Sequence, residues 1–184
     1  MSAKSAIAAL FAGALALFAV APASVAQGVA KDASKDATTA KPGAKIGSKF
    51  GAWEIRCDRP TGAPREQCAL MQSLAAADRP NLTLVVMLLK PADGKPPILR
   101  MIAPLGVWIG NGIALSIDAD TLGRAPFVRC LSSGCIADVL LDDKLIGKLE
   151  AGKTATFVLY DTPEAGVGLP LALANLKDGL DTLK

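Results

Sequence analysis

Cysteine has the most varied chemistry of any residue type in this chain, since a thiolate can bind a metal, attack a substrate or form a disulfide. The sequence contains Cys57, Cys68, Cys130 and Cys135. Their spacings are C-x10-C and C-x4-C, whereas structural zinc sites use closer knuckles such as C-x2-C, so we predict disulfides rather than zinc. Of the three connectivities, we expect Cys57–Cys68 and Cys130–Cys135, because each pair is close in sequence and encloses turn-forming residues.

The acidic segment that begins at Asp118 is a second candidate for chemistry. The pattern D-x-D-x-x-G at residues 118–123 starts like a calcium-binding loop. Leu122 stands where the fifth position needs an oxygen ligand, and Arg129 stands where the twelfth needs a glutamate, so calcium is disfavoured. A hydrolase that uses carboxylates alone remains an alternative. It would draw on the clustered acids Asp118, Asp120, Asp142 and Asp143.

Nucleophilic catalysis lacks its usual base, because the chain contains no histidine. Ser132 and Ser133 occupy a constrained turn, but the nearest lysine in sequence, Lys144, lies beyond a predicted strand. The sequence has no nucleophile-elbow, phosphate-loop, zinc-protease or S-x-x-K motif. We predict that the chain is not an enzyme and uses neither a metal nor another cofactor.

The elements around these residues begin with a predicted export signal. Residues 1–26 contain one charge, at Lys4, followed by an apolar run over residues 6–20. Small residues before Ala26 predict cleavage after it, and the apolar run is shorter than the roughly 20 residues that span a bilayer. We predict an exported chain, in the periplasm or on the outer envelope surface, that is not an integral membrane protein.

Residues 27–48 are poor in large apolar side chains and predict a flexible linker. Six of the chain's lysines precede Phe50, and they account for the net charge of +3. From Phe50 onward there are 14 basic and 15 acidic residues, a net charge of −1. The domain therefore has no basic footprint for nucleic acid, and we expect none as a partner.

Residues 49–184 predict one domain made mainly of β-strands. Trp53, Ile55 and Cys57 alternate with small or polar residues, which is the period of a half-buried strand. Residues 82–90 are apolar on both faces and predict a central strand covered on both sides. Short strands separated by turn signals favour an antiparallel β-sandwich. Further strands are expected at residues 68–74, 98–103, 107–110, 113–117, 125–130, 134–141, 154–160 and 169–173.

Turn-forming residues are concentrated in the middle of this domain. Asn111-Gly112 lies between two apolar runs and predicts a hairpin, because both residue types tolerate the positive φ of a type I′ turn. Gly134 gives backbone freedom to the turn that the second cysteine pair encloses. The residues that we assign to structural turns are Pro104, Gly106, Asn111, Gly112 and Gly134.

Two short helices complete the predicted domain. Asp142 or Asp143 would cap the first helix, and Gly152 follows its end. Asn175 would cap a closing helix. The apolar faces of the two helices would consist of Leu145, Ile146 and Leu149, and of Leu176, Leu180 and Leu183.

Several of these residues also form a pattern when they are taken together. They are Trp53-Glu54-Ile55-Arg56-Cys57, Cys68, Pro104-Leu105-Gly106-Val107, Gly112, Asp118, Pro126-Phe127, Cys130 and Gly134-Cys135. This pattern, which covers residues 50–184, resembles the invasion-associated locus B protein family of bacteria. The resemblance implies an exported, disulfide-bonded, immunoglobulin-like β-sandwich that the family name links to invasion of host cells. The closing segment, residues 175–183, departs from the family pattern.

We therefore expect a non-enzymatic envelope protein that binds an unknown protein or envelope component through sandwich loops or an edge strand. Its role would lie in host-cell invasion or envelope integrity, and an exposed edge strand would also allow the chain to form homo-oligomers. Two alternatives remain: the carboxylate-dependent hydrolase, and a structural or stress-related periplasmic factor without a specific ligand.

Overall fold

The structure, a computed structural model, describes residues 45–59, 65–91 and 94–183. The predicted signal peptide and all of the predicted linker except residues 45–48 lie outside this part of the chain. Within residues 45–48, Gly47 donates a backbone hydrogen bond to Ile55, and Ser48 accepts one from the same residue. The last residues of the predicted linker are therefore hydrogen-bonded to the domain.

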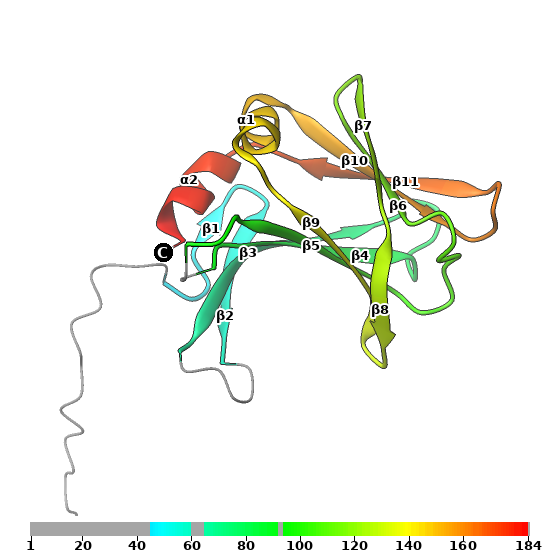
Figure 1. The fold of residues 1–184 in the computed structure, drawn as a ribbon, viewed down its shortest axis with the longest axis horizontal. Coiled ribbons are helices and arrows are strands. Elements are labelled where there is room, and N and C mark those ends of the chain that lie inside the picture. Colours follow the sequence, from blue (N-terminus) through cyan, green and yellow to red (C-terminus); the bar gives the residue numbers. More distant parts are fainter. Residues whose placement is uncertain (1–44, 60–64, 92–93, 184) are drawn as a thin grey trace, which may run out of the picture. The chain divides into compact units, whose positions relative to one another are not determined.

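Seven strands of the described chain form the larger sheet, in the order β1-β2-β3-β4-β5-β9-β8 (Figure 1). Every neighbouring pair is antiparallel, and the first five strands follow one another along the chain as a meander. The bounds are β1 Lys49–Phe50, β2 Trp53–Asp58, β3 Gln67–Ala75, β4 Thr83–Leu89, β5 Ile98–Ala103, β8 Phe127–Leu131 and β9 Gly134–Leu140.

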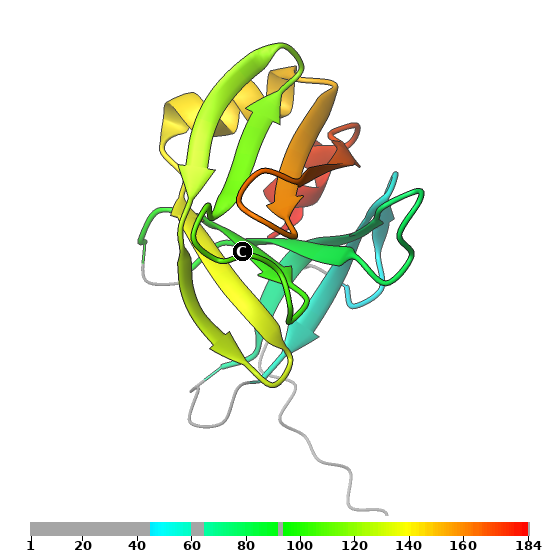
Figure 2. The ribbon, with the colours of Figure 1, turned by 90° about the vertical axis from the view of Figure 1, so that its right-hand side faces the viewer.

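The smaller sheet has the order β11-β10-β6-β7 and is also antiparallel. Its strands are β6 Ile113–Ile117, β7 Asp120–Ala125, β10 Thr154–Tyr160 and β11 Gly166–Ala172. Figure 2 shows the two sheets as layers of a sandwich. Together with two short helices and two local disulfides, they confirm the predicted fold class, an immunoglobulin-like antiparallel β-sandwich.

The core between the sheets follows from the alternation of side chains along each strand. In β4, Leu84, Val86 and Leu88 are buried, while the residues between them are not. Trp53 and Phe157 are the largest fully buried side chains. Since a fully buried Leu, Val or Phe contributes about 1.5 to 3 kcal/mol, this inner layer accounts for most of the drive to fold.

Both helices lie where the sequence predicted them. The first, α1 (Asp143–Ala151), is capped by Asp142, whose carboxylate accepts a hydrogen bond from Leu145 N at 2.7 Å. The second, α2 (Leu176–Thr182), follows Asn175, which has a φ of 62° but makes no side-chain capping bond. Its three predicted leucines, Leu176, Leu180 and Leu183, are buried. No helix in the described residues is long and apolar enough to cross a bilayer.

The hairpin predicted at Asn111-Gly112 is not formed, so this prediction was wrong. The segment expected to be its first strand cannot pair with β6, because β7 and β10 occupy both edges of that strand. Gly112 N donates to Ile109 O, which places the turn one residue earlier, and Asn111 has no positive φ. The tight connection lies instead at Asp118-Ala119, between β6 and β7, where Asp118 has a φ of 50°.

Two predicted turn glycines have a clear structural reason. Gly134 has a φ of 135°, and a Cβ at this position would collide with the carbonyl oxygen of Ala103. Gly112 has a φ of 62°, and its Cβ would collide with the carbonyl oxygen of Ala125. Both positions therefore need glycine for backbone conformation and for close approach to a neighbouring strand.

Along one side of the sandwich, β7 runs almost directly into β8 and so carries the chain from the smaller sheet to the larger one. The strand β7 lies at the edge of the smaller sheet, and β8 lies at the edge of the larger one. Pro126 alone separates them, and it has no N–H to leave unpaired where the chain passes from one sheet to the other. Each strand thus has one partner and one free edge.

Candidate interaction surfaces

The clustered acids considered for hydrolysis have structural contacts. Asp142 caps α1. Asp120 forms an ion pair with Lys148 at 3.0 Å, which ties the β6–β7 hairpin to the same helix. Asp143 lies in the first turn of α1, where a negative charge is favourable to the helix dipole.

Asp118 joins two elements of the smaller sheet. Its carboxylate accepts hydrogen bonds from Lys153 N at 3.2 Å and Thr154 N at 3.0 Å, and its own N–H donates to Thr154 O at 2.8 Å. Asp118 thus holds the start of β10 beside the β6–β7 turn. Asp118 and Asp120 bind different donors, since Asp118 accepts from backbone amides and Asp120 pairs with the Lys148 ammonium.

Both disulfides pair as predicted, Cys57 with Cys68 and Cys130 with Cys135. Each bond joins residues directly opposite each other on neighbouring strands. The first staples β2 to β3, and the second staples β8 to β9 near the turn that contains Gly134. The larger sheet is therefore cross-linked at two places near its opposite edges.

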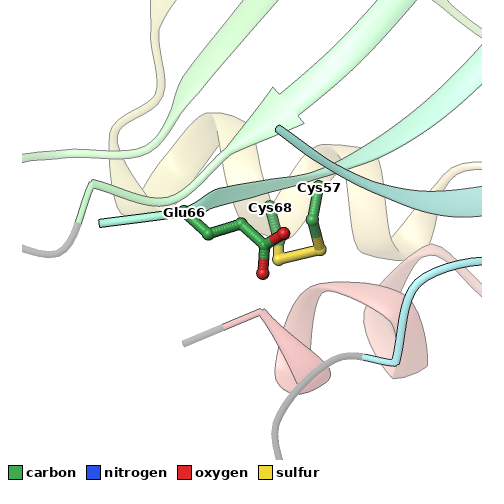
Figure 3. A group of neighbouring side chains, drawn as sticks. All are labelled: Cys57, Glu66 and Cys68. Carbon is green, nitrogen blue, oxygen red and sulfur yellow. A yellow bond between two sulfur atoms is a disulfide. The ribbon is translucent and has the colours of Figure 1, made fainter. Parts of the chain in front are cut away.

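Glu66 lies beside the first disulfide, and its carboxylate is within 4.8 Å of the sulfurs of Cys57 and Cys68 (Figure 3). Two cysteines and a carboxylate at this spacing are a plausible ligand set for a divalent metal. Metal binding requires thiolates, however, and both sulfurs are already joined in a disulfide. In this state the group is a structural cross-link with an exposed acid next to it.

Three loops lie together at the end of the sandwich away from α1 and α2 (Figure 1). They connect β3 to β4, β5 to β6 and β10 to β11, and they line a pocket of about 470 Å3. An ion pair between Arg79 and Asp161 crosses from the first loop to the third. Asn111 donates a hydrogen bond of 2.7 Å to the carbonyl of Pro163, so the second loop is also bound to the third.

The loop between β5 and β6, residues 104–112, exposes large apolar side chains at this end. Leu105, Trp108 and Ile109 are 57%, 44% and 56% exposed. The backbone N–H of Trp108 donates to Tyr160 O at 2.6 Å. The loop is thus tied to β10 while its apolar side chains face solvent.

The outer face of the larger sheet is a second apolar surface. Because side chains alternate, the residues between the core positions of β3, β4 and β5 point away from the core. Most of them are half-buried hydrophobic residues: Met71, Val85, Met87, Leu89, Ile98 and Ile102. Within the described part of the chain no helix or strand covers this face, so the prediction that the central strand β4 is covered on both sides is wrong there.

A charged pair lies in the middle of this outer face. Arg100 donates from Nε and Nη2 to the two carboxylate oxygens of Asp138, at 2.8 Å each. These hydrogen bonds raise the pKa of Arg100 above its usual value, although partial burial acts in the opposite direction. Met87 is the residue directly opposite Arg100 on β4. The face thus combines apolar contact area with a fixed, paired charge.

Both surfaces were missed from the sequence, and only the loop has a signal there. To recognise the outer face, one must know that four neighbouring strands bring together Met71, Met87, Arg100 and Asp138. Only the sheet order and register supply this. An exposed apolar surface could have been predicted for the loop, because residues 101–117 contain no charged residue. That stretch was instead assigned to a hairpin.

Two free edges bear on the prediction of self-association. The edge strand β8 exposes Val128 and Leu131, and β7 continues the same edge into the other sheet. An unpaired edge of this kind can accept another strand. Formation of homo-oligomers stays a prediction.

The comparisons with known proteins agree with one another. A family model described as "Invasion associated locus B (IalB) protein" matches residues 53–184. Two invasion protein B homologues, from Brucella abortus strain 2308 and from Brucella abortus biovar 1 strain 9-941, are each 27% identical to this chain over 134 residues. The alignment covers 72% of this chain and 75% of each relative.

A solved structure has the same fold. The crystal structure of invasion associated protein B from Bartonella henselae superimposes with a TM-score of 0.59 at 19% identity, over 74% of this chain and 93% of the other. The family model spans the sandwich from β2 to the end of the chain, including both disulfides and both helices. The chain therefore belongs to the invasion-associated locus B family.

Proposed function

We propose that this chain is an exported, non-enzymatic protein of the bacterial envelope that binds a protein or envelope component through the outer face of its larger sheet. The observation that carries this proposal is the apolar surface around the Arg100–Asp138 pair. A sheet face that does not pack on the protein's own core is expected to be polar. Here it presents hydrophobic residues around the oriented Arg100–Asp138 pair, with a second ion pair, Arg56–Glu54, on the neighbouring strand β2, a combination suited to specific binding.

Three further observations support the proposal. Two disulfides suit an oxidising compartment outside the cytoplasm. The relatives from Brucella and Bartonella are named as invasion proteins, and we propose a role in host-cell invasion or envelope integrity for this chain as well. Three of the four clustered acids, Asp118, Asp120 and Asp142, contact Lys148 or backbone amides, which gives them structural roles.

Affinity capture from envelope extract tests the proposal, with the mature chain immobilised through its C-terminus. The informative variant is Met87→Glu, which places a charge on the outer face beside Arg100. Thr156→Glu is the matched control, because Thr156 lies on the outer face of the smaller sheet, likewise half-buried on a strand. Both variants should keep the far-ultraviolet circular dichroism of the native chain.

A partner that is captured by the native chain and by Thr156→Glu, but at least about tenfold less by Met87→Glu, would support the proposal, since burying an additional carboxylate in an apolar interface costs more than about 1.4 kcal/mol when Asp138 already pairs Arg100. Equal capture by both variants would exclude this face. Repeated capture of nothing above background would favour a structural factor without a ligand. Deletion of the gene then separates the roles, because a structural factor weakens the envelope without changing entry into host cells.

A further inference from the structure

The β5–β6 loop, residues 104–112, combines exposure with a lack of charge. Its Leu105, Trp108 and Ile109 side chains are about half exposed, although they are among the most apolar in the chain. No acidic or basic residue occurs between Arg100 and Asp118. Protein interfaces usually surround an apolar centre with polar and charged residues, and this loop supplies none of its own charges for such a rim.

The backbone of the loop is already hydrogen-bonded at several points. Trp108 N donates to Tyr160 O, and Gly112 N donates to Ile109 O at 3.1 Å. The side chain of Asn111 is bound to the carbonyl of Pro163. A segment can enter a lipid layer at low cost only when its backbone groups are satisfied internally, and these bonds meet part of that requirement.

We propose that the β5–β6 loop inserts Leu105, Trp108 and Ile109 into the interfacial layer of a phospholipid bilayer and so holds the domain at a membrane surface. Tryptophan is enriched at the headgroup level of membranes, where its ring meets the acyl chains and its N–H meets water. Leucine and isoleucine beside it contribute the apolar area that drives such binding. The loop tip thus has the composition of an interfacial anchor.

The charges next to the loop indicate which lipids it binds. Arg79 on the β3–β4 loop is paired with Asp161 on the β10–β11 loop. Asp78 and Glu164 on the same two loops add two negative charges at this end of the sandwich, against one positive charge from Arg124, which lies over the ring of Tyr160. Attraction to anionic headgroups is therefore not the source of binding, and neutral phospholipid should bind at least as well as anionic phospholipid.

The chain carries its own reporter for this event. It has two tryptophans, of which Trp53 is 1% exposed and Trp108 is 44% exposed. Transfer of Trp108 into lipid should shift the fluorescence emission to shorter wavelength, while Trp53 contributes a constant background. The mature chain is mixed with phosphatidylcholine vesicles at millimolar lipid in high salt, which screens the lysines that precede the domain. Flotation measures binding in the same samples.

The expected result is flotation with a blue shift, both reduced at least about fivefold in Ile109→Ser and in Leu105→Ser, because each substitution removes an aliphatic side chain that the bilayer would bury. Val128→Ser is the control, since Val128 is 64% exposed but lies on β8. It should float like the native chain. Trp108→Phe should lose the shift and retain part of the flotation.

Several outcomes would overturn the inference. These are no flotation on neutral vesicles, equal flotation of Ile109→Ser and the native chain, or flotation that requires anionic lipid and disappears in salt. A blue shift of Trp108 with envelope protein but not with lipid would assign the loop to a protein partner. The outcome is separate from that of the proposed function, because the capture experiment varies the outer face and leaves the loop unchanged.

Discussion

Substitution of Asp118 offers a direct test of how the smaller sheet is held together. In Asp118→Ala, the N–H groups of Lys153 and Thr154 lose their carboxylate acceptor. Hydrogen bonds to charged groups contribute about 1.5 to 3 kcal/mol, but these are exposed and water replaces part of the loss, so we expect about 1 to 2 kcal/mol for both together. Alanine at the left-handed φ of 50° adds about 1 kcal/mol.

The total loss for Asp118→Ala is thus about 2 to 3 kcal/mol of unfolding free energy, or a fall in Tm of about 8 to 12 °C for a domain of this size. Urea titration followed by circular dichroism measures it. Asp118→Asn should lose about 1 kcal/mol or less, since asparagine tolerates this φ and keeps one acceptor oxygen.

Asp120→Ala is the matched control. Asp120 lies two residues away, is exposed, and makes a surface ion pair with Lys148, for which the expected loss is under about 0.5 kcal/mol. If Asp118→Ala and Asp120→Ala destabilise the chain equally, Asp118 does not hold β10, and the assignment of a structural role to this acid is refuted.

Three further changes should alter stability in the same assay. Asp142→Ala removes the cap of α1 and should cost about 1 kcal/mol, whereas an unchanged urea midpoint would contradict the capping role. Gly134→Ala places a Cβ against the carbonyl of Ala103 at a φ of 135°, so it should cost more than about 2 kcal/mol and favour unfolded chain in gel filtration. Cys57→Ser with Cys68→Ser opens a loop of sequence separation 11 and should cost about 2 to 3 kcal/mol, and dithiothreitol should then destabilise this variant less than the native chain.

The strands and helices were predictable where local signals and tertiary structure agree. Residues 98–103 and 154–160 were predicted with the bounds that β5 and β10 have, because a short apolar run in the first and an alternating pattern in the second mark a strand. The first helix was also predictable, since Asp142 precedes and Gly152 follows a segment with the apolar periodicity of a helix. Both disulfides followed from the closeness of the paired cysteines in sequence and from the turn-forming residues between them.

The errors arise where pairing partners decide the structure. Residues 107–110 look like a strand, yet both edges of β6 are occupied by β7 and β10. The strand β7 is mostly exposed, with the burial pattern of an edge, so it lacks the apolar alternation that marks a strand in sequence. Its turn, Asp118-Ala119, contains no glycine and gives a weaker hairpin signal than Asn-Gly. The outer face of the larger sheet was hidden for the same reason, since it depends on which strands lie side by side.

The order of the cysteines bears on how this domain matures. Each bond joins a cysteine to the next one along the chain, so cysteines that are oxidised in the order in which they leave a translocation pore form the native pairs without reshuffling. The first bond requires only the hairpin of β2 and β3, and the second requires only that of β8 and β9. In an exported chain, an oxidase alone would therefore suffice, and loss of a disulfide isomerase should leave the yield of folded protein unchanged.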